Sequence, residues 1–180
     1  MEDRLKDGRI VNGTWASRPP AARKATLHSK PPIIGIKRSC MAFAPISHLI
    51  ILAAGIAAWL VGGIYYGVLG KPWMAALGKT KDELRPGGKM PILPMLISFV
   101  ADLIIAFVMA GAIGHLGPGN VTLKNGLISA AILWFGFAVT TMATNNAFGQ
   151  RSFALTVIDS GHWLLAFLVA GAVLGGFGGA

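Results

Sequence analysis

Charged side chains and cysteine are both scarce in this 180-residue chain. Only 13% of its residues are charged, whereas a soluble globular domain has roughly 25%. With a mean hydropathy of +0.63, this scarcity argues against a soluble fold and indicates a membrane protein. The single cysteine, Cys40, excludes an intramolecular disulfide and a cysteine-built metal cluster.

Motifs of common enzymes are also missing. The chain has no His-Glu-x-x-His sequence and no cysteine pair, so it predicts no metal site. The glycine-rich end, residues 175–179, lacks the lysine and serine of a phosphate-binding loop. Few basic residues follow position 40, so nucleic-acid binding has no support. We therefore expect no cofactor, and no motif identifies an enzyme.

Positive charge is concentrated at the start of the chain. Residues 1–40 hold nine of the sixteen Lys and Arg residues and have a disordered composition rich in Pro, Arg, Lys and Ser. This tail is either a transit peptide or lipid-binding basic arm, or an upstream extension of a chain that begins at Met41. We favour the start at Met41, which leaves residues 41–180 as one membrane domain.

Four apolar segments are long enough to cross a bilayer, which takes about 20 residues. They cover residues 46–69, 92–116, 123–148 and 153–177. Short turns join the last three segments, so these helices should be antiparallel neighbours. The sequence thus predicts an all-α, polytopic membrane protein built as a bundle of four transmembrane helices.

The first loop is longer and has structure of its own. Residues 71–77 place Trp73, Met74 and Leu77 on one face, which predicts a short interfacial helix. The spacing of Thr80 and Glu83 predicts a capping box that starts one further turn. Aromatic residues at this membrane surface are predicted interfacial anchors: Tyr65, Tyr66 and Trp73.

The basic residues of the membrane domain are distributed unequally between its two sides. If translation starts at Met41, loops 1 and 3 together carry six Lys and Arg residues, whereas the opposite side carries only Lys124. Positively charged loops stay in the cytoplasm. We therefore expect loops 1 and 3 inside and both termini outside.

Small residues recur four positions apart in several spans, a spacing that lets membrane helices approach closely. The pairs and triplets are Ala54, Ala58 and Gly62; Gly63 and Gly67; Ala106 and Ala110; Ala166 and Ala170; Gly171 and Gly175. This pattern predicts a tightly packed bundle, and it is compatible with a homo-oligomer or a membrane protein partner.

Three stretches carry a resemblance to a known family. They are GGIYYGVLGKPWMAALG after the first span, TTMATNNAFGQRS at the end of the third, and VIDSGHWLL in the fourth. Over residues 46–177 the chain resembles domain-of-unknown-function family 1761, bacterial integral membrane proteins with four predicted helices. The resemblance implies the fold and a bacterial inner-membrane location, and it implies no activity.

Polar residues inside the spans are the main indication of function. With a rise of 1.5 Å per residue, we expect Asp159 roughly 9 Å, His162 roughly 14 Å and Asp102 roughly 15 Å from the loop 1/loop 3 surface. Further polar residues end the third span near the same surface: Thr140, Thr141, Thr144, Asn145 and Asn146. An ionised carboxylate at mid-membrane costs roughly 2.5–3.5 kcal/mol, so these acids need partners, water or a proton.

Three interpretations of these polar residues remain open. In one, Asp102, Asp159, His162, Asn145 and Asn146 line a cavity that binds a small solute, a cation or a proton. In another, the groups hydrogen-bond to one another and hold the helices together. In the third, His162 acts as a catalytic base. We expect a structural or accessory membrane component, with the binder or carrier as the alternative.

Overall fold

The computed structural model describes residues 44–179, so the basic tail of residues 1–40 and its two interpretations lie outside the described residues. Within residues 44–179, four helical segments are long and apolar enough to cross a membrane. Their bounds are His48–Leu77, Ile92–Gly114, Leu123–Phe148 and Phe153–Phe177. The prediction of an all-α membrane bundle is confirmed, and the chain is a multi-pass membrane protein.

The first span, α1 (His48–Leu77), is longer than predicted. Its 30 residues extend about 45 Å, whereas the hydrocarbon core of a bilayer is about 30 Å thick. The helix begins after Ser47 and ends at Gly78, which has the left-handed φ of 71° that glycine tolerates. Residues 71–77 are helical, as predicted, but they continue α1 instead of forming a separate helix.

The loop after α1 contains two short turns of helix. The first, α2 (Lys81–Leu84), begins with the predicted capping box. The Glu83 carboxylate accepts hydrogen bonds from the Thr80 N–H at 2.6 Å and the Thr80 hydroxyl at 2.8 Å. A 3₁₀ turn, η1 (Pro86–Gly88), follows before α3 (Ile92–Gly114) enters the membrane.

The third span is interrupted by a wider turn that the sequence did not predict. It consists of α4 (Leu123–Leu133), a π-helical segment η2 (Trp134–Val139) and α5 (Thr140–Phe148). The Thr140 hydroxyl donates to the carbonyl of Gly136 at 2.7 Å. That bond satisfies a carbonyl in the wide turn, where the regular ladder of helix hydrogen bonds changes.

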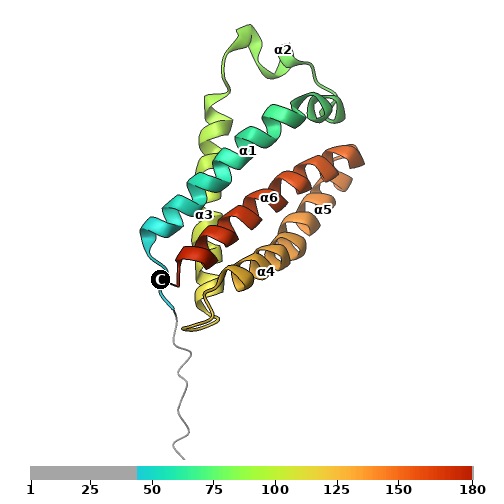
Figure 1. The fold of residues 1–180 in the computed structure, drawn as a ribbon. Coiled ribbons are helices and arrows are strands. Elements are labelled where there is room, and N and C mark those ends of the chain that lie inside the picture. The colour runs from blue at the N-terminus through green and yellow to red at the C-terminus, as the bar shows by residue number, and fades with distance from the viewer. Residues whose placement is uncertain (1–43, 180) are drawn as a thin grey trace, which may run out of the picture. The chain divides into compact units, whose positions relative to one another are not determined.

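The last span, α6 (Phe153–Phe177), is the centre of the bundle. In Figure 1 it lies between α1 on one side and the α4–α5 span on the other, and it also contacts α3. Its buried positions include several small residues at the predicted spacing: Ala166, Ala170, Gly171 and Gly175. Close helix packing around these residues is therefore confirmed.

Not every small-residue pair packs against a helix. Ala54, Ala58 and Gly62 are buried in α1, but Gly63 and Gly67 are exposed, and a Cβ atom at either position would meet nothing within 4 Å. Within residues 44–179 this pair therefore packs against no other helix, because one face of α1 meets α3 and α6 while this face is turned away from them. Sequence spacing does not reveal which face is turned inward.

Candidate functional site

Asp159 is the centre of a polar cluster between α1 and α6. Its Oδ1 accepts a hydrogen bond from the Tyr66 hydroxyl at 2.8 Å and another from the Trp73 indole N–H at 3.0 Å. The Tyr66 and Trp73 rings themselves meet edge to face, with centroids 5.5 Å apart. Both donors reach one carboxylate because α1 runs without a break from Tyr66 to Trp73.

Glycines allow the two helices to come this close. The Tyr65 hydroxyl donates to the backbone carbonyl of Ile158 at 2.8 Å. A Cβ atom at Gly161 would lie 2.7 Å from that hydroxyl, and one at Gly62 would lie 2.6 Å from Nε2 of His162. Each glycine therefore leaves room for a ring from the facing helix.

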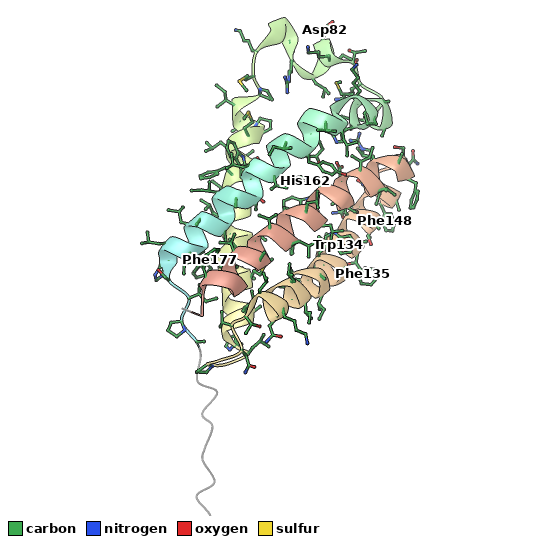
Figure 2. The ribbon with its side chains drawn as sticks, in the orientation of Figure 1. Asp82, Trp134, Phe135, Phe148, His162 and Phe177 are labelled. Carbon is green, nitrogen blue, oxygen red and sulfur yellow. The ribbon has the colours of Figure 1, made fainter. Side chains whose placement is uncertain are left out.

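His162 is enclosed by aromatic rings. It is 7% exposed, and its ring centroid lies 4.8 Å from that of Tyr66, 5.8 Å from that of Tyr65 and 5.0 Å from that of Trp163. Figure 2 shows it between the α1 and α6 ribbons. Its Nδ1 is buried and has no hydrogen-bond partner among residues 44–179, so this edge of the imidazole ring can still donate or accept one hydrogen bond.

Asp102 lies away from this cluster. It is 3% exposed on α3, and it packs beside Gly55 of α1, where a Cβ atom would lie 3.4 Å from the Asp102 carbonyl oxygen. His162 packs beside Gly62, seven residues further along α1, which corresponds to about 10 Å along the helix axis. The two residues therefore meet α1 at levels about 10 Å apart, although residue counting predicted nearly the same depth for them.

The difference between Asp102 and His162 arises because α3 does not begin level with the end of α1. The Trp59 indole N–H of α1 bonds to the Met95 carbonyl at 3.3 Å and the Ser98 hydroxyl at 3.2 Å, close to the start of α3. From Trp59, α1 continues to Leu77. Counting residues from each helix start assumed a common membrane surface, and that assumption fails for α3.

The two asparagines of the third span have different environments. The Asn146 side chain donates to the Thr156 hydroxyl of α6 at 3.0 Å. Asn145 is instead exposed, and with Thr140, Thr141 and Thr144 it lies on one open surface of α5. The five polar residues that end this span therefore do not share one site with Asp159 and His162.

Sequence reasoning missed two tryptophans that join helices. The Trp134 indole N–H donates to the Ser160 carbonyl of α6 at 2.8 Å, and Trp59 bonds to α3 as described above. A tryptophan in the middle of an apolar span is a usable signal, because its indole N–H needs an acceptor when no water is present. The acceptors here are mainly backbone carbonyls, which no sequence pattern identifies.

The chemistry available at the site is hydrogen bonding and proton exchange. Within the described part of the chain, no three His, Cys, Asp or Glu side chains come together in a way that could hold a metal ion. Oδ1 of Asp159 is occupied by two donors, whereas the carboxylate of Asp102 has no hydrogen-bond partner among residues 44–179. The site thus combines a well-bonded cluster with two groups, the Asp102 carboxylate and Nδ1 of His162, that have no hydrogen-bond partner in the described part of the chain.

Comparison with known proteins places this architecture in a family. Neither a curated protein nor a solved structure matches the chain. A match to one family covers residues 49–175, which include all the helices that build the cluster. The chain therefore belongs to the family described as Protein of unknown function (DUF1761).

Proposed function

We propose that this protein is a structural or accessory component of a bacterial inner membrane, and that its polar residues hold the bundle in one arrangement. The observation that carries the proposal is the position of Asp159, which accepts from two side chains of α1 at once. In hydrocarbon, side-chain hydrogen bonds between helices are worth about 0.6 kcal/mol on average and up to about 1.7 kcal/mol. Such bonds specify which helices meet and at what register.

Other polar contacts support the same role. Tyr65 to Ile158, Trp134 to Ser160 and Asn146 to Thr156 all join α6 to a neighbouring helix. The Ser152 hydroxyl, just before α6, donates to the Ala76 carbonyl near the end of α1 at 2.7 Å. Polar groups arranged this way stabilise the packing of the helices. Because their donors are already used between helices, few remain to bind a solute.

A double-mutant cycle tests the structural role. Tyr66→Phe and Asp159→Leu each remove the hydrogen bond between these two side chains, and we expect a coupling of about 0.6–1.7 kcal/mol between them. Tyr65→Phe is the matched control, because it removes the same hydroxyl from the adjacent residue, whose acceptor is the Ile158 carbonyl. Equal coupling of Asp159→Leu to both tyrosines, or none to either, would contradict the proposal.

A second candidate function is a proton or small-cation binder. It is favoured by two groups on buried residues, the Asp102 carboxylate and Nδ1 of His162, which have no hydrogen-bond partner among residues 44–179. An ionisable residue inside a membrane span is a functional hypothesis by default, since its burial is costly. Asp102 and His162 meet α1 at positions about 10 Å apart along the helix. This distance favours two separate sites over one shared cavity.

Native mass spectrometry distinguishes the two candidates. Wild-type protein and Asp102→Asn are compared after purification from membranes, and proton uptake into vesicles containing each is followed with an internal pH dye. A bound mass or proton flux that the variant loses supports the binder. Identical bare subunits without flux in both support the structural role and direct the search to protein partners.

A further inference from the structure

Asp102 is an acid on a buried residue whose carboxylate has no partner. The residue is 3% exposed and lies near the middle of α3, and its carboxylate makes no hydrogen bond or ion pair with another residue of the range 44–179. Asp159 differs in this respect, because its Oδ1 accepts from Tyr66 and Trp73. Of the two acids in the described spans, only Asp102 therefore has no protein group that stabilises a negative charge.

Other titratable groups of the bundle lie at different levels from Asp102. Those on the helices that contact α3, and directly after its end, are His48, Tyr65, Tyr66, Lys71, His115, Lys124, Asp159 and His162. Asp102 packs beside Gly55 of α1, whereas His48 begins that helix and His162 packs beside Gly62. Each of these two histidines is thus seven residues of α1 away, or about 10 Å along its axis. The two lysines lie near helix ends, so no nearby cation compensates an ionised Asp102.

The surroundings of Asp102 offer too few oxygen atoms for a metal cation, since calcium and magnesium take about six or more oxygen ligands. Between residues 49 and 61 of α1 the only polar side chain is the Trp59 indole, which is a donor, and residues 164–177 of α6 have no polar side chain. The Ser98 hydroxyl, one turn before Asp102, accepts from Trp59 and donates to the Met95 carbonyl. A single carboxylate remains, and one carboxylate is sufficient for a proton.

We propose that Asp102 is a proton-binding site whose carboxyl group is protonated at neutral pH. The inference rests on the second candidate function, and it names the bound ion as a proton and the site as Asp102 without His162. A protonated carboxyl is uncharged, so it avoids the cost of a charge inside an apolar bundle. Its O–H can donate to the Ser98 carbonyl four residues earlier, as the hydroxyls of Thr140 and Thr144 donate to carbonyls four residues before them.

Reaction of the full-length protein with a hydrophobic carbodiimide in lipid vesicles tests the proposal. The carboxyl proton passes to one nitrogen of the reagent and the carboxyl oxygen bonds to its central carbon, so the adduct keeps the whole mass of the reagent and peptide mass spectrometry locates it. We expect Asp102 to be labelled at neutral pH, and the labelling to fall about tenfold for each pH unit once the carboxyl ionises. Sodium or calcium ions at constant pH should leave the labelling unchanged. A water-soluble carbodiimide should label Asp82, which is exposed in the loop, and not Asp102.

Infrared spectroscopy supplies a second measurement that does not depend on access of a reagent. The C=O stretch of a protonated carboxyl should be present in the wild type at neutral pH, lose intensity in Asp102→Asn and be retained in the matched variant Asp159→Asn. No loss of that band in Asp102→Asn, or protection of Asp102 from labelling by sodium or calcium ions, would overturn the proposal. Labelling and the band without proton flux into vesicles support the proton site and count against transport. Flux without either signal overturns the proton site and leaves transport supported, so the two failures are distinguishable.

Discussion

Replacing Gly171 by alanine is expected to destabilise the bundle through the contact between α4 and α6. A Cβ atom at Gly171 would lie 2.5 Å from the carbonyl oxygen of Gly126 and 2.8 Å from Cβ of Ala130. Ordinary contact begins near 3.4 Å, so the two backbones have to separate locally by about 0.9 Å, a gap that forfeits a quarter to a half of the dispersion attraction. Overpacking of this kind costs about 1–3 kcal/mol.

Gly176→Ala is the matched control for this prediction. Gly176 lies in the same helix, is exposed, and has nothing within 4 Å of a built Cβ atom. Both substitutions remove the glycine penalty of roughly 1 kcal/mol in a helix, so that contribution cancels in their difference. The free energy of unfolding should therefore be about 1–3 kcal/mol lower for Gly171→Ala than for Gly176→Ala.

Unfolding by sodium dodecyl sulfate in mixed micelles, followed by circular dichroism, measures this difference. Adding Ala130→Gly to Gly171→Ala should recover part of the loss, because it removes one of the two close contacts. Recovery should be incomplete, since the Gly126 carbonyl still obstructs the new methyl group. Equal stability of Gly171→Ala and Gly176→Ala would refute the packing argument.

Three further predictions concern other parts of the fold. Trp134→Phe removes the hydrogen bond to the Ser160 carbonyl and should lower the free energy of unfolding by about 1 kcal/mol; unchanged stability in the same detergent assay would contradict this. Hydrogen bonds from the N–H and hydroxyl of Thr80 lower the pKa of Glu83, so the capping box should stabilise α2 above the unfolded pKa of roughly 4.3 and lose this effect as the pH falls through the lower folded pKa. The amide NMR shift of Thr80 reports this titration, and a midpoint at the unfolded value would argue against the bond. The positive-inside rule places the loop of residues 78–91 in the cytoplasm. Cysteines introduced there should therefore react with a membrane-impermeant reagent only after the cells are permeabilised, and labelling in intact cells would show that the loop lies outside.

Properties set by local chemistry could be predicted from the sequence. The four spans follow from the length and apolar character of each segment, because a bilayer selects about 20 such residues wherever they occur. The capping box of Thr80 and Glu83 also needs only neighbouring residues. The importance of Asp102, Asp159 and His162 could be proposed because ionisable groups in an apolar span are rare. These inferences need no knowledge of how the helices pack.

The partners of each polar residue were decided only by the tertiary structure. Asp159 lies three residues before His162, but its hydrogen bonds go to Tyr66 and Trp73, which are 93 and 86 positions away in the chain. Asp102 is separated from the cluster because α1 and α3 are offset along their axes, and apolar helices of similar composition carry no sequence mark of that offset. The outward rotation of Asn145 has the same origin: it depends on which face of α5 meets α6, and that is a property of the packed bundle.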